Sequence, residues 1–63
     1  MFTTVLSSLS VGTKFMLRDS IDIYCVTKVE RGFNKTIVVT ENLTLCHETI
    51  VDGYIRVMPL YSL

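Results

Sequence analysis

Apolar and polar residues alternate along most of this chain in short segments, and turn-forming residues separate the segments. Residues 13–18 show the pattern, with Phe15 and Leu17 on one side and Met16 on the other. An alternation with a period of two is typical of strands that are buried on one face. The β-favouring residues Val, Ile and Thr fill 21 of the 63 positions. We therefore expect an all-β fold.

The same signals predict five strands, at residues 13–18, 21–30, 35–41, 43–50 and 54–58. Residues 31–34, which contain Gly32, and residues 51–53, which contain an Asp-Gly pair, are predicted to form turns. Pro59 lacks the backbone N–H that a central strand needs, so we expect the last strand to end before it.

The second predicted strand carries apolar residues on both faces. Alternation puts one set on one face, namely Ile21, Ile23, Cys25 and Val29. It puts another set on the opposite face, namely Tyr24, Val26 and Lys28. We therefore expect a β-bulge, through which this strand serves two parts of a closed or nearly closed sheet.

Five strands in so short a chain leave unpaired edges, which closure into a barrel removes. We expect a small, mainly antiparallel barrel that occupies residues 1–63 as a single domain. The first ten residues leave two alternatives open. Phe2, Val5, Leu6 and Leu9 have helix-like spacing, whereas residues 3–6 have the composition of a strand. A short strand or a single helical turn is expected to cap one end of the barrel.

Residues 9–17, Leu-Ser-Val-Gly-Thr-Lys-Phe-Met-Leu, are followed by Tyr24-Cys25-Val26 and Val29. This run resembles the opening of small barrels of the Src-homology 3 kind, many of which are encoded by bacteriophages. The resemblance covers residues 9–30 and implies a small viral accessory protein that binds and modulates a host protein in the cytoplasm. Family members that hold proline-rich peptides use a tryptophan and an acidic loop. This chain has no Trp, so recognition of such peptides is not expected.

Six basic and six acidic residues give a net charge of zero, which argues against general attraction to nucleic acid or to an anionic membrane. The apolar runs are only a few residues long, as at residues 15–17, and too short to cross a bilayer. The residues after Met1 do not resemble a secretory signal. We therefore expect a cytoplasmic protein with Cys25 and Cys46 as free thiols.

Cys46 and His47 form the one cluster that suggests metal or thiol chemistry. Adjacent residues of a strand point to opposite faces, so these two side chains are poorly placed to share an ion. The acidic residues fall mostly at turns or strand ends, and a barrel this small fills its interior with side chains. We expect no enzyme activity, no cofactor, no metal and no small-molecule substrate.

Protein binding or self-association is the expected function, because many apolar side chains are predicted to lie outside the barrel. The candidate protein-binding surface consists of Met16, Tyr24, Val26, Val38 and Tyr61. The apolar residues 58–63 either seal the barrel or contact a second subunit.

The alternative function is nucleic-acid binding by the second hairpin. There a phosphate backbone would meet basic side chains while a base stacks on an aromatic ring. The candidate residues are Lys28, Arg31, Phe33 and Lys35, with Glu30 among them.

Overall fold

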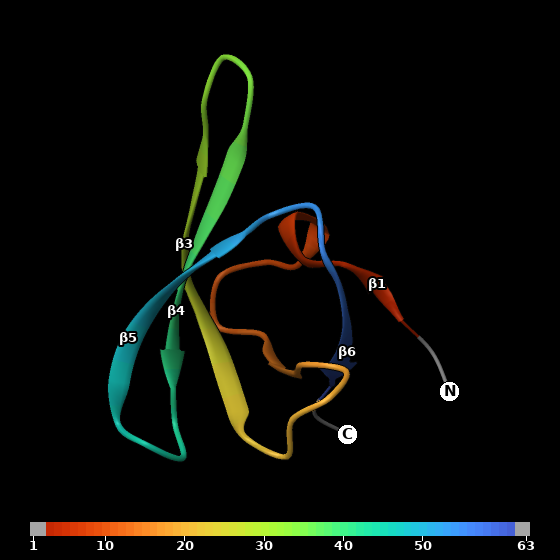
Figure 1. Ribbon diagram of the computed structural model, residues 1–63, viewed down its shortest axis with the longest axis vertical. Helices are drawn as coiled ribbons and strands as arrows, with labels where there is room; N and C mark the ends of the chain where they lie inside the picture. The colour runs from red at the N-terminus through yellow and green to blue at the C-terminus, as the bar shows by residue number, and fades with distance from the viewer. Residues whose placement is uncertain (1–2, 62–63) are drawn as a thin grey trace.

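The alternating segments pair into one antiparallel sheet. A computed structural model describes residues 3–61, in which six strands follow the order β1-β6-β2-β3-β4-β5 (Figure 1). The strands are β1 (Thr4–Val5), β2 (Lys14–Met16), β3 (Ile23–Arg31), β4 (Thr36–Asn42), β5 (His47–Asp52) and β6 (Arg56–Leu60). A 3-10 helix, η1 (Leu6–Ser8), follows β1. The expected all-β class is confirmed, and no helix in residues 3–61 is long and apolar enough to cross a membrane.

The sheet is open, so the expected closure into a five-stranded barrel is wrong. β1 and β5 are its two edges, and they lie on opposite sides of the molecule in Figure 1. The sixth strand is β1, which lies in the N-terminal segment where a short strand was one of the two expected alternatives. Which strands lie at the edges depends on pairings between distant segments, and local patterns do not report those pairings.

The N-terminal segment contains both expected alternatives, since β1 runs directly into η1. Leu6 donates its N–H to the carbonyl of Ile55, and Ser7 donates to that of Gly53, both at 2.8 Å. Leu6 and Leu9 are buried in the core. This segment therefore covers one end of the core and attaches to the connection between β5 and β6. Phe2, part of the helix-like spacing, lies outside the described residues.

The core lies on one face of the curled sheet, beneath η1. Its buried apolar residues are Leu6, Leu9, Phe15, Tyr24, Val26, Val38 and Val57. Phe15 and Tyr24 are register partners on β2 and β3, and their rings stack with centroids 5.4 Å apart. The bulge expected in β3 is present, as a shift in register between Val26 and Lys28. It returns Val29 to the core side, where this residue packs against the cluster.

The fourth strand begins later than the sequence predicts. Residues 43–46 form a turn, and β5 starts at His47 and continues to Asp52. The side-chain Oδ1 of Asn42 accepts hydrogen bonds from the N–H groups of Thr44 and Leu45, both at 2.9 Å. These bonds fold the segment back, so the alternation of Leu43 with Leu45 does not mark a strand.

Pro59 lies inside β6, so the prediction that it ends the last strand is wrong. It is the register partner of Phe15 on β2. On the opposite side of β6, the pairing with β1 covers only Arg56 and Val57. Within residues 3–61 the ladder on that side ends before Pro59, so the missing N–H interrupts no strand bond there.

Candidate functional site

The hairpin between β3 and β4 carries the predicted nucleic-acid site and projects from the body of the molecule (Figure 1). Gly32 donates its N–H to the carbonyl of Lys35 at 2.7 Å and closes the tip. Phe33, at the tip, is 100% exposed. An aromatic ring and the Lys35 ammonium group are therefore accessible together at this end of the molecule.

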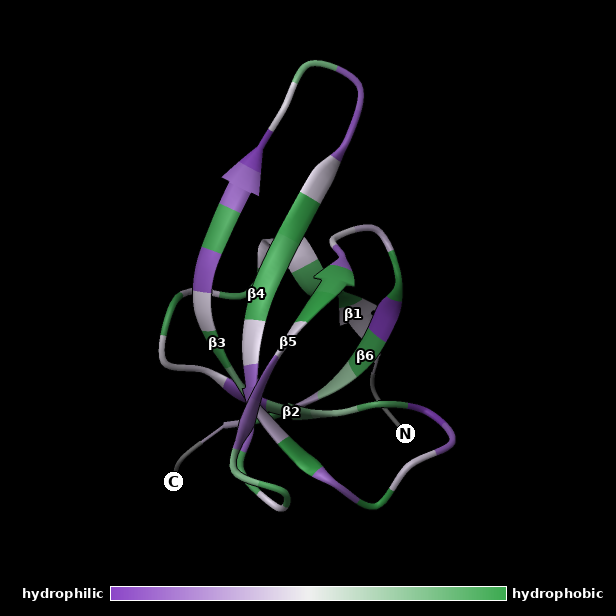
Figure 2. Cartoon of the chain, turned by 60° about the vertical axis from the view of Figure 1, so that its left-hand side comes forward, coloured by the Kyte–Doolittle hydropathy of each residue, from purple (hydrophilic) through white to green (hydrophobic). Residues whose placement is uncertain are grey.

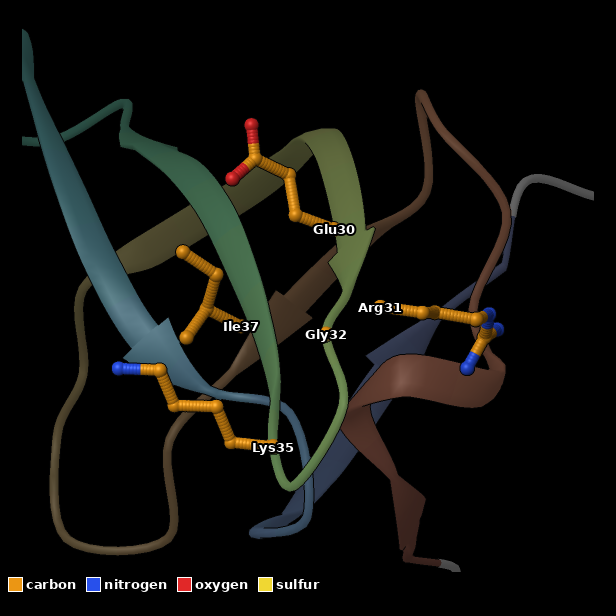
Figure 3. A pocket seen from close by; sticks show the side chains of 5 residues that line it. All are labelled: Glu30, Arg31, Gly32, Lys35 and Ile37. Atoms are coloured by element: carbon orange, nitrogen blue, oxygen red, sulfur yellow. The ribbon is translucent and has the colours of Figure 1, made fainter.

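Two of the three predicted cations of this hairpin make contacts within the chain. Lys28 Nζ lies 2.7 Å from Glu30 Oε2, and this hydrogen bond together with the Glu30 charge raises the pKa of Lys28. Arg31 donates from its guanidinium group to the carbonyl of Ser7 at 3.1 Å. Figure 3 shows Arg31 directed toward η1, away from Glu30 and Lys35. The four predicted residues therefore do not form one free basic patch.

A shallow pocket lies near the tip of this hairpin, where β3 ends and β4 begins. It is lined by Glu30, Arg31, Gly32, Lys35 and Ile37 (Figure 3). Its volume of about 210 Å³ is below the roughly 300–1,000 Å³ typical of small-molecule sites. Its charged side chains are of both signs, so it offers no uniform field to an ion.

Three residues of the predicted protein-binding surface are in the core instead. Tyr24, Val26 and Val38 are buried, so a partner has no access to them. Opposite residues of an antiparallel pair share a face, and Phe15 is opposite Tyr24. The face of β3 that we expected outside is therefore the face that packs on Phe15.

The other two predicted surface residues differ in exposure. Met16 is half-buried in β2, whereas Tyr61 is 61% exposed just after β6. Of the C-terminal segment, residues 58–60 belong to β6 and pair with β2. The remainder of that predicted contact, residues 62–63, lies outside the described part of the chain.

The cysteines and the histidine lie apart from any cluster of acidic ligands. Cys25 is half-buried and Cys46 is exposed, and both are free thiols. His47 Nδ1 is 3.4 Å from the hydroxyl of Thr49. Within residues 3–61, no three side chains of the His, Cys, Asp and Glu types are grouped to hold a metal ion.

The edge of β5 is a surface that the sequence did not identify. In residues 3–61 the one strand paired with β5 is β4, which leaves the other edge open. Gly53, directly after β5, donates its N–H to the carbonyl of Thr36 on β4 at 2.8 Å. Along an antiparallel strand, successive residues direct their backbone N–H and C=O groups alternately toward one neighbour and toward the other. Residues an odd number of positions from Gly53 therefore direct these groups away from β4. The outward N–H and C=O groups belong to Glu48, Ile50 and Asp52.

The side chains of these same three residues lie on the outer face of the sheet. Val38 is buried on the core face, so its neighbours Ile37 and Val39 lie on the outer face. The register places Asp52 opposite Ile37 and Ile50 opposite Val39. Ile50 is 65% exposed. In Figure 2 β5 begins hydrophilic and turns hydrophobic toward its arrowhead, next to the hydrophobic middle of β4, before it ends at the acidic Asp52.

The signal for this edge was present as the alternation of Glu48, Ile50 and Asp52. The predicted strand ended at residue 50 and the predicted turn included Asp52, so the three residues were divided between two elements. No protein-family model, curated protein or solved structure matches the chain. The function of the chain must therefore be inferred from its own surface.

Proposed function

We propose that this chain is a non-catalytic protein-binding module that takes an extended segment of a partner along the open edge of β5. The observation that carries the proposal is the set of outward backbone groups at Glu48, Ile50 and Asp52. An unpaired strand edge is a template for a further strand, and many proteins bind peptides by extending a sheet in this way.

The exposed side chain of Ile50 supports the same surface. It stands at the middle of β5, and its neighbour across the ladder is the half-buried Val39. An apolar residue of an added strand would contact Ile50, and this contact would remove the apolar surfaces of both side chains from water. Backbone hydrogen bonds would supply most of the affinity, and this apolar contact would select the side chain.

The resemblance of residues 9–30 to Src-homology 3 barrels extends the proposal to a biological role. On that analogy, the chain is a small accessory protein of a bacteriophage that binds and modulates a protein of the host. What supports this role is the quoted motif, whereas the strand edge supports binding itself.

Nucleic-acid binding at the tip of the β3–β4 hairpin is the second candidate. The fully exposed Phe33 beside Lys35 favours it. Lys28 is paired with Glu30, and Arg31 is bonded to Ser7, so a bound strand would meet few free cations. Protein binding is therefore the function that the geometry supports better.

The test compares two variants as baits in a bacterial lysate. Ile50→Pro removes an outward N–H and leaves the bonds to β4, a position at which edge strands tolerate proline. Arg31→Ser with Lys35→Ser removes two cations of the hairpin, the bonded Arg31 and the free Lys35. We expect a specific partner to bind the wild type and the hairpin variant, and to bind Ile50→Pro about tenfold more weakly. A nucleic acid lost with the hairpin variant, or a partner retained by Ile50→Pro, would contradict the proposal.

Amide hydrogen exchange tests the same contact in the wild type and does not depend on how well Ile50→Pro folds. In the free chain, the outward amides of Glu48, Ile50 and Asp52 exchange faster than those of Thr49 and Val51, which face β4. With the captured partner present, we expect the three outward amides to become protected. Unchanged exchange at Ile50 in the complex contradicts strand addition.

A further inference from the structure

The outer face of β5 presents two acids on either side of one apolar residue. Glu48, Ile50 and Asp52 are spaced by two residues, so they stand in one row along the open edge. All three are exposed. An added strand would place its own side chains opposite them at the same spacing.

The charges of this row are not balanced by the chain itself. Glu48 lies directly opposite Glu41 on β4, an apposition of like charges. Asp52 accepts a hydrogen bond from the N–H of Tyr54 at 2.9 Å, a neutral donor. In the described part of the chain, the single ion pair joins Lys28 to Glu30. The edge of β5 is therefore an acidic rim around an exposed Ile50.

We infer that the edge of β5 selects an extended protein segment in which basic residues lie two positions before and two positions after an apolar residue. This inference rests on the proposed function and specifies its partner. The central apolar side chain contacts Ile50, and the Lys or Arg side chains on either side meet Glu48 and Asp52. The pattern reads the same in both directions, so it applies to either orientation of the added strand.

A second copy of this chain fits the same edge poorly. Two β5 strands paired antiparallel about Ile50 would put Glu48 opposite the Asp52 of the other copy, on both sides of the centre. A register centred on Thr49 would place Glu48 diagonal to both acids of the other copy. Like charges on neighbouring strands are destabilising, so a basic segment of another protein is the better complement.

Four synthetic nine-residue peptides with blocked ends test the inference. STKTVTKTS carries the matched pattern, STETVTETS reverses its charges, and STKTSTKTS removes its apolar residue. STTKKTVTS keeps the composition of the first peptide but puts its lysines on opposite faces. Each is titrated into the wild-type chain to about 5 mM, which nearly saturates a site with a Kd near 1 mM. Amide chemical shifts of Glu48, Ile50 and Asp52 are followed.

We expect the matched peptide to bind about fivefold tighter than the scrambled peptide, with the largest shifts at the three outward amides. The charge-reversed peptide should cause no such shifts. Equal binding of the matched and scrambled peptides would overturn the inference, as would shifts confined to the β3–β4 hairpin. Absence of any shift at the highest concentration would overturn it too.

A double variant of the chain tests the contribution of the two acidic side chains alone. Glu48→Gln with Asp52→Asn removes both charges and keeps an oxygen at residue 52 to accept from Tyr54. We expect this variant to bind the matched and charge-reversed peptides within about twofold of each other. A preference for lysine that persists in the variant would contradict the role of these acids. If Ile50→Pro still loses the lysate partner while the peptides show no charge preference, the proposed function stands and this inference alone fails.

Discussion

At the scale of single residues, Cys46 holds a strained backbone conformation at the end of the turn before β5. Its φ of 60° is in the left-handed region, where a side chain costs roughly 1 kcal/mol. The side chain is exposed and so recovers little by packing. We expect Cys46→Gly to raise the free energy of unfolding by about 0.5–1 kcal/mol, measured by urea denaturation. Cys46→Ala keeps the strain and serves as the control, so equal stability of the two variants would contradict this reading.

Gly53 is required for close approach rather than for an unusual φ. A Cβ at this position would lie 2.9 Å from both the carbonyl oxygen and Cγ2 of Thr36, and 3.2 Å from Cβ of Ser7. Because two segments must separate to admit it, Gly53→Ala should lower the free energy of unfolding by about 2–3 kcal/mol. Gly12 is the control, since it has a φ of +94° and open space around it. A smaller loss for Gly53→Ala than for Gly12→Ala in denaturant titrations would show that the close contact relaxes.

At the scale of elements, Asn42 joins the end of β4 to two loops. It is buried, its Oδ1 accepts from Thr44 and Leu45, and its Nδ2 donates to Asp22 Oδ2 at 3.1 Å. Asn42→Ala leaves these groups without partners, and we expect a loss of about 2–4 kcal/mol.

Asn42→Asp keeps the acceptor for the turn but replaces the donor to Asp22 with a second buried carboxylate, so a loss at least as large as that of Asn42→Ala is expected. Amide exchange at Thr44 and Leu45 separates the two effects: it should accelerate in Asn42→Ala and change little in Asn42→Asp. Equal acceleration in both variants would show that the turn does not depend on the Oδ1 acceptor.

Long alternating segments with β-branched residues were predictable, and β3 and β4 lie close to their expected bounds. The bulge in β3 was also predictable, because apolar residues on both faces require a change of register. Which side of β3 faces the core was not predictable, because it depends on Tyr24 lying opposite Phe15 on another strand. Residues 43–46 show a further limit: their alternation suits a strand, but side-chain bonds from Asn42 fold them into a turn.

The candidate site was predictable only in part, for the same reason. The exposed hairpin tip follows from local sequence, because Gly32 and Asn34 mark a turn and Phe33 lies between them. The open edge of β5 follows from the strand order of the whole sheet, and no local pattern encodes that order. The engagement of Arg31 by Ser7, 24 positions away, is likewise a long-range contact.

At the scale of the whole molecule, a net charge of zero conceals an uneven distribution along the sheet. Residues 36–63 contain one base, Arg56, against three acids, and all three acids lie on β4 and β5. Arg56 contacts Thr3 at the other edge of the sheet. The acids therefore remain concentrated beside the open edge of β5. Charged side chains on an edge strand oppose pairing between copies of a protein.

This distribution predicts which change produces self-association. The wild-type chain should sediment as a monomer at low and high protein concentration, because pairing of two β5 edges brings carboxylates together. Glu48→Gln with Asp52→Asn removes the repulsion while leaving Ile50 and the outward backbone groups in place. We expect this variant to show a mass that rises with concentration. Adding Ile50→Pro should restore the monomer, because it removes an N–H that the pairing needs. Self-association of the wild type through β5, or a monomeric Glu48→Gln with Asp52→Asn variant, would show that these acids do not prevent pairing at this edge.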